Sequence, residues 1–87
     1  MKEAHATHQK ALNRVKVIKE EIKALEKEFK ELETESYVKA RFIANSYGKN
    51  AETIKEYGQR LKWIPMRLRE IEARIKHLGE EKEKISR

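Results

Sequence analysis

The sequence predicts an all-α fold, an antiparallel coiled-coil hairpin of two long helices joined by a turn at about residues 47–50. Apolar residues recur at alternating spacings of four and three along both halves of the chain, which is the repeat of a coiled-coil seam. The first glycine, Gly48, lies between the two series and marks the fold-back. The two seams also match each other in one register, which fixes the relative direction of the helices.

The first helix is expected over about residues 4–46, because no glycine or proline interrupts the chain before Gly48. The stretch Thr34–Ser36 is its weakest part, since Ser and Thr are poor helix formers. Heptad positions a and d of this helix form a mainly apolar seam. The seam consists of Ala11, Val15, Ile18, Ile22, Leu25, Phe29 and Leu32, continued by Ser36 and Ile43.

The second helix is expected over about residues 51–85, with Asn50 as its N-cap and Glu52 in the first turn, where the helix dipole favours a carboxylate. Because a proline removes a backbone hydrogen bond, we expect a kink near Pro65. The seam nevertheless keeps one phase across this proline. Its residues are Ile54, Tyr57, Leu61, Ile64, Leu68, Ile71, Ile75, Leu78, Lys82 and Ile85.

The register follows from the position numbers. If the chain folds back at Gly48, facing residues should have numbers that add to about 97, as Ile22 and Ile75 or Phe29 and Leu68 do. The g positions beside the seams then predict four pairs of opposite charge: Arg14 with Glu81, Glu21 with Arg74, Glu28 with Arg67, and Glu35 with Arg60. Such exposed pairs specify the register and orientation of the helices more than they stabilise the fold. A parallel pair of helices would lose both matches.

The composition limits the class of protein. At 87 residues we expect one domain, 1–87, too small for a deep core of its own. There is no cysteine, so we expect neither disulfides nor thiolate chemistry. No apolar run is long enough for a bilayer, and the N-terminal residues lack the apolar segment of a signal peptide. These features predict a soluble protein of the cytoplasm with no membrane partner.

An enzyme is not expected. The chain has no aspartate and no glycine-rich phosphate loop, and the hairpin register places no base beside Ser36, Ser46 or Ser86. No cofactor is predicted. His5 and His8 are three residues apart but have no third ligand nearby, so we predict no metal site.

The net charge of +6 lies entirely in the middle of the chain. Residues 37–69 hold eight Lys and Arg against two Glu, while the segments on either side are neutral. Five of the six aromatic residues are in the same middle segment. This concentration of positive charge favours an anionic partner, either a nucleic acid or an acidic protein.

A nucleic-acid interface is the first hypothesis. Basic residues occupy b positions of both helices, and heptad spacing sets successive members about 10 Å apart along a helix, within reach of alternate phosphates. Such a stripe binds phosphate without reading sequence. The candidate residues are Lys16, Lys23, Lys30, Lys55, Lys62, Arg69 and Lys76. The stripe predicts a small nucleic-acid-binding or regulatory protein, although b-position lysines are also common on solvated coiled coils.

The alternative hypothesis is a protein-interaction module, an adaptor or inhibitor that binds an acidic partner around Trp63, Met66 and Phe42. Tryptophan and methionine are enriched in interface cores. Apolar residues outside the seam also suggest that two hairpins pair into a four-helix bundle, as a homodimer or higher oligomer. The candidate protein-interface residues are Val17, Val38, Phe42, Trp63 and Met66.

Residues 40–59 admit one further interpretation. The segment Ile43–Gly48 followed by Thr53–Lys55 resembles part of the sigma-factor type of helix-turn-helix, which implies DNA reading by the second helix. The chain departs from that pattern at Lys49, where a small apolar residue is usual. In architecture it is similar to small helical-hairpin proteins that pair into four-helix bundles, some of which bind RNA.

Overall fold

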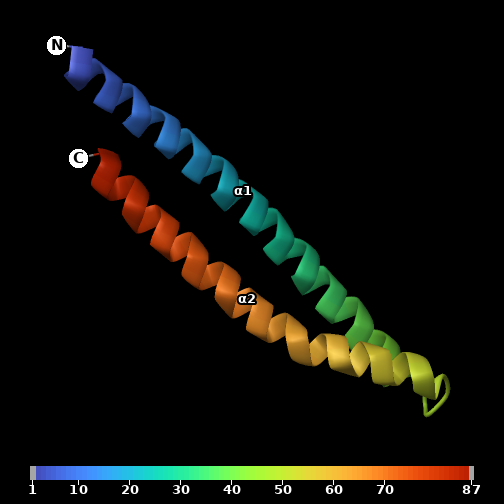
Figure 1. Cartoon of the computed structure of the whole chain (residues 1–87). Coiled ribbons are helices and arrows are strands. Elements are labelled where there is room, and N and C mark those ends of the chain that lie inside the picture. The colour runs from blue at the N-terminus through green and yellow to red at the C-terminus, as the bar shows by residue number, and fades with distance from the viewer. Residues whose placement is uncertain (1, 87) are drawn as a thin grey trace.

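The protein forms a thin rod of two antiparallel helices. The computed structural model describes the backbone of residues 2–86 and the side chains of residues 8–85. Helix α1 spans Lys2–Asn45 and helix α2 spans Ala51–Ser86, and both ends of the described chain lie at one end of the rod (Figure 1). The principal extents are 71 × 15 × 15 Å. The predicted helical hairpin is therefore confirmed.

Neither helix breaks at its weak point. In α1, the Thr34 hydroxyl donates to the carbonyl of Lys30 at 3.0 Å, so this side chain is accommodated within the helix. Helix α2 continues through Pro65, and its ribbon bends in the yellow-to-orange part of Figure 1. A bend is the expected response, because proline removes one backbone hydrogen bond without preventing the rest of the ladder.

The core is a single seam between the helices. Five apolar side chains are buried: Ile18, Leu32, Ile64, Ile71 and Leu78. Four half-buried residues pack around the central part of this core: Leu25, Phe29, Leu68 and Ile75. All nine belong to the predicted seams. The two helices therefore pack through a single line of buried residues, and most of their remaining surface is exposed to solvent.

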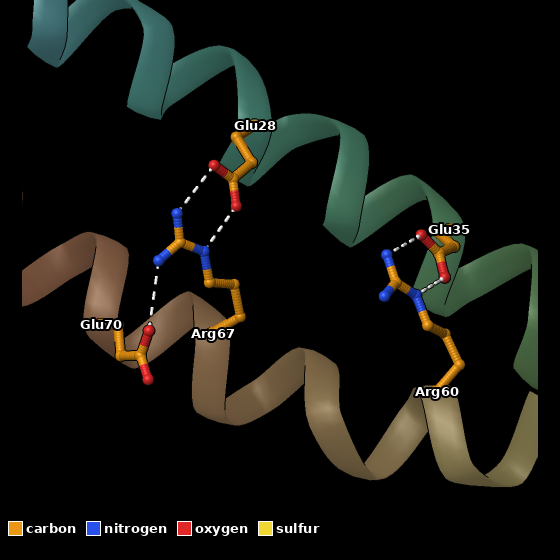
Figure 2. A network of polar contacts seen from close by, with 5 residues as sticks. All are labelled: Glu28, Glu35, Arg60, Arg67 and Glu70. Atoms are coloured by element: carbon orange, nitrogen blue, oxygen red, sulfur yellow. Dashed lines mark hydrogen bonds and ion pairs between the residues drawn. The ribbon is translucent and has the colours of Figure 1, made fainter.

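The four predicted interhelical charge pairs are all present. Arg14 lies 2.9 Å from Glu81, Arg74 lies 3.2 Å from Glu21, and Arg67 lies 2.6 Å from Glu28. Arg60 also forms two hydrogen bonds with Glu35. Figure 2 shows the two central pairs crossing from α2 to α1. The observed partners fix the same register as the seam.

One layer of the seam contains a lysine that contacts an aromatic ring, and this contact was not predicted. Lys39 occupies a d position and faces Tyr57, with its ammonium 4.9 Å from the centre of the ring. The same ammonium lies 3.1 Å from a carboxylate oxygen of Glu35. The lysine stem is half-buried while its charge is partnered, so the seam continues toward the turn.

The turn reverses the chain in five residues, from Ser46 to Asn50. Three of them adopt left-handed backbone conformations: Tyr47 with φ of 49°, Gly48 with φ of 80° and Asn50 with φ of 61°. The amide of Lys49 donates to the carbonyl of Ser46 at 2.9 Å. Asn50 occupies the predicted N-cap position, because its carbonyl accepts the first hydrogen bond of α2, from the amide of Ile54. Its side chain forms no hydrogen bond with the described residues.

The turn also bears on the helix-turn-helix interpretation. Helices α1 and α2 leave the loop as antiparallel neighbours that remain side by side (Figure 1). A helix-turn-helix places its two helices at about 90–120° to each other. Residues 40–59 are therefore the end of the hairpin and lack the crossed helices of a helix-turn-helix.

Candidate functional site

The two long sides of the hairpin differ in how their charged residues are arranged. One side carries the four Arg–Glu pairs at the g positions, and we call it the paired side. The other side carries the b positions, which lie on the opposite flank of the seam because of the helical repeat. We call it the lysine side, and its cations are Lys16, Lys23, Lys30, Lys55, Lys62, Arg69 and Lys76.

Hydrogen bonds from arginine lower the pKa of several carboxylates on the paired side. A hydrogen bond from Arg67 lowers the pKa of Glu28 below its ordinary value, and Arg14 does the same for the pKa of Glu81. The pKa of Glu35 is lowered mainly by the hydrogen bond from Arg60 and further by Lys39. These charges neutralise one another across the helices, so the paired side has little cationic character to offer a polyanion.

All seven cations of the lysine side are exposed. None of them forms an ion pair with any residue that the structure describes. On α2 the four members follow one another at every b position from Lys55 to Lys76, and we call them the α2 column. The adjacent f positions, Gln59, Met66 and Ala73, are uncharged. Carboxylates lie nearby at Glu52, Glu72 and Glu80, but no member of the α2 column forms an ion pair with a described residue.

The surface between the α1 and α2 members of the lysine side is not basic. A groove of about 360 Å³ lies there, with Phe29 and Ile75 among its lining residues. Three carboxylates also line it: Glu26, Glu33 and Glu72. A polyanion laid along the groove would meet these carboxylates. These carboxylates outnumber Lys30, the one cation in the groove lining, and they separate the α1 cations from the α2 column.

The candidate protein-interface residues do not form one patch. Val17 and Val38 are 49% and 57% exposed but lie three heptads apart on α1, about 30 Å along the helix axis. Phe42 packs edge-on against Tyr57, with ring centres 5.1 Å apart. Val17 is therefore far from Val38 and Phe42, which lie near the end of α1, while Trp63 and Met66 belong to α2.

The α2 part is held by a cation–aromatic contact. The Arg60 guanidinium lies 4.3 Å from the centre of the Trp63 ring, while the same arginine is paired with Glu35. Trp63 remains 42% exposed, and Met66, one turn further along α2, is 62% exposed. Arg60 therefore positions the indole without covering it.

A groove at the turn end of the hairpin was not expected from the sequence. It has a volume of about 560 Å³ and lies between the last turns of α1 and the loop. We call it the tip groove, and the residues that matter here are Tyr37, Val38, Arg41, Phe42, Asn45 and Lys49. One feature of the sequence could have indicated an apolar surface here. Tyr37 occupies a b position, and the three preceding heptads have lysine at that position.

Other classes of site are not indicated in the part of the chain that the structure describes. His8 is exposed, the His5 side chain lies outside the described residues, and the described side chains include no group of three potential metal ligands. Across residues 2–86, neither helix has an apolar stretch long enough to cross a bilayer.

Comparison of the chain with protein-family models, curated proteins and solved structures gave no match.

Proposed function

We propose that this protein is a small, non-enzymatic nucleic-acid-binding protein that contacts the phosphate backbone through the α2 column. The supporting observation is the row of four exposed cations, Lys55, Lys62, Arg69 and Lys76, that have no carboxylate partner among the described residues. Successive members are about 10 Å apart along a straight helix. Long side chains at that spacing can reach alternate phosphates of one strand, and the helix backbone needs no further ordering to bind.

The geometry favours binding without sequence recognition. Phosphate contacts position a protein on nucleic acid, whereas sequence is read at the base edges. The f positions beside the column, Gln59, Met66 and Ala73, offer one amide and no charge. Binding should therefore depend strongly on salt and weakly on base sequence.

The test is a binding titration with duplex DNA, single-stranded DNA and RNA at several salt concentrations. For duplex DNA, four phosphate contacts predict a slope of about −3 to −4 in the logarithm of the association constant against the logarithm of salt concentration. The variant Lys62→Gln/Arg69→Gln should reduce that slope by about 2. Affinity that stays constant with salt would refute the proposal.

A matched control separates the α2 column from net charge. Lys10→Gln/Lys27→Gln removes the same charge from exposed residues of α1 that also form no ion pair with the described residues. This variant should keep the wild-type slope. Equal losses in the two variants would mean that total charge, and not the α2 column, determines binding.

We also propose that the hairpin forms a homodimer or a higher oligomer. The supporting observation is the thin core, in which five of the described apolar side chains are buried, while Val17 and Trp63 on the paired side remain about half-exposed. Pairing of two hairpins would bury more apolar surface. Sedimentation equilibrium checks this, and a monomer mass at all concentrations would exclude it.

The second candidate function is an adaptor or inhibitor that binds an acidic protein at Trp63 and Met66. Its support is the exposed indole held in place by Arg60, because rigid aromatic side chains are frequent interface anchors. Trp63→Ala should then abolish partner binding while leaving the salt-dependent binding of nucleic acid unchanged.

A further inference from the structure

The tip groove differs from the rest of the surface in being both open and apolar. It runs along the last turns of α1, where Val38 and Phe42 lie one helical turn apart, and the loop closes its end. Its lining consists mainly of apolar atoms. Tyr37 and Val38 are 65% and 57% exposed. The groove is thus a small apolar surface with a polar rim.

The rim of the tip groove is positive. Arg41 and Lys49 line it, and no carboxylate does. Neither cation forms an ion pair with a described residue, and Arg41 donates only to the Tyr37 hydroxyl, at 3.3 Å. The groove therefore presents apolar surface and unneutralised positive charge together.

The walls of the tip groove are ordered before any partner arrives. The Phe42 ring packs edge-on against Tyr57, with an interplanar angle of 65°. Below it, the Ser46 hydroxyl donates to the carbonyl of Phe42 at 2.6 Å, and Ser46 is only 8% exposed. A preformed surface loses little conformational entropy on binding, which favours affinity from a small contact area.

Charge and shape together limit the occupant. A phosphate backbone has no apolar part for Val38 and Phe42, and the row of α1 lysines ends where Tyr37 replaces the next b-position cation. A second copy of the chain is also disfavoured. Its exposed Trp63 and Met66 have Lys62 and Arg69 nearby in the sequence, and these two cations, which form no ion pair with a described residue, would face the positive rim.

We infer that the tip groove binds a short acidic amphipathic helix of a partner protein. Two apolar side chains one turn apart on that helix pack against Val38 and Phe42, and its carboxylates contact Arg41 and Lys49. This is the helix-in-groove mode of recognition, in which apolar anchors one turn apart supply affinity and flanking charges supply orientation. The inference concerns a different surface from the α2 column and does not depend on nucleic-acid binding.

The test uses three synthetic helical peptides of about 12 residues, roughly 18 Å long. The first has glutamates and two leucine anchors one turn apart; the second replaces the leucines with alanine, and the third replaces the glutamates with lysine. Each is titrated into the isotope-labelled full chain while its amide resonances are followed. Only the first peptide should shift resonances, and the shifts should cluster in residues 37–50.

Two sets of variants identify the contacts. Arg41→Glu/Lys49→Glu should weaken the first peptide about tenfold or more, through like-charge repulsion at the rim. Lys10→Glu/Lys27→Glu makes the same change in net charge away from the groove and should leave the affinity unchanged. Val38→Ala retains helix propensity but removes apolar contact, and should also weaken binding. Circular dichroism confirms that each variant keeps its helical content.

Several results would overturn the inference. Equal binding of the alanine peptide would mean that charge alone is recognised. Unchanged affinity in the Arg41→Glu/Lys49→Glu variant would remove the electrostatic argument. Shifts concentrated along the α2 column would place the peptide elsewhere, and tip resonances that move with protein concentration alone would show that a second copy occupies the groove.

Discussion

Arg67 of α2 binds both carboxylate oxygens of Glu28 on α1, at 2.6 and 3.0 Å, and its third nitrogen donates to Glu70 at 3.2 Å (Figure 2). All three nitrogens of the guanidinium are thus engaged. The pair lies beside the central core formed by Leu32, Ile64 and Ile71. Among the interhelical contacts it combines two-point geometry with a position at mid-seam, so it is well placed to specify register.

A charge swap tests that assignment. Glu28→Arg places two guanidiniums opposite each other and should lower the thermal midpoint of unfolding. Glu28→Arg combined with Arg67→Glu restores opposite charges and should recover most of the loss. Recovery should be incomplete because Glu70 then lies beside a carboxylate three residues away. Thermal unfolding of the three proteins measures this, and a double variant no better than the single one would contradict it.

Stability should fall in mild acid. The pKa values of Glu28, Glu35 and Glu81 in the folded chain lie below their ordinary value of 4.5, because arginines hydrogen-bond the ionised forms. A carboxylate with a lowered pKa in the folded state stabilises that state above its unfolded pKa, and the contribution is lost as pH falls through the folded pKa. The free energy of unfolding should therefore decline as pH drops below about 5.

A variant identifies the source of that decline. Arg60→Gln removes the main cause of the lowered pKa of Glu35. Its stability should change less with pH than that of the wild type over the same acidic range. Urea titrations from neutral pH to about pH 3 provide the comparison. Identical slopes for the two proteins would show that the Glu35 pair contributes nothing to the acid response.

Truncation in the seam should be costly at its centre and mild at its ends. Ile64 and Ile71 are fully buried, so Ile64→Ala or Ile71→Ala should cost about 2–5 kcal/mol through lost burial and the cavity left behind. Ile85 is half-buried in the last described turn of α2, so Ile85→Ala should cost less. Chemical unfolding measures the series, and equal losses at the centre and the end would contradict a seam-centred core.

The glycines should respond in opposite directions. A Cβ at Gly58 or Gly79 meets nothing within 4 Å, and both residues lie inside α2, so alanine at either should stabilise the chain by about 0.5–1 kcal/mol. Gly48 has equal space but a φ of +80°. Gly48→Ala should therefore destabilise the turn by about 1–2 kcal/mol. Thermal unfolding of the three single variants measures both effects.

The hairpin and its register could be predicted because they depend on position numbers alone. The spacing of the seam and the four g-position pairs each pointed to the same fold-back. The contact between Lys39 and Tyr57 was not predicted, because the repeat gives the heptad position of Lys39 but not what its ammonium contacts. In the folded chain its ammonium lies over the Tyr57 ring and also pairs with Glu35.

The candidate sites were only partly predictable. Heptad phase assigned Lys55 and its neighbours to one edge, but whether a long, flexible cation finds a carboxylate depends on rotamers that a sequence does not specify. The tip groove depends on the path of the loop. Left-handed conformations at Tyr47, Gly48 and Asn50 return the chain against the end of α1, and that path places Lys49 in the groove wall.

The placement of both described ends at one end of the rod has a mechanical consequence (Figure 1). Force applied between Lys2 and Ser86 would act across the rod and separate the helices from that end. Only the layer at the fork would carry load at any moment, beginning with the small contact at Ala11. The hairpin should therefore open at low force, one layer after another toward the turn. Force applied between one terminus and the turn acts along the rod and would instead load all layers at once in shear.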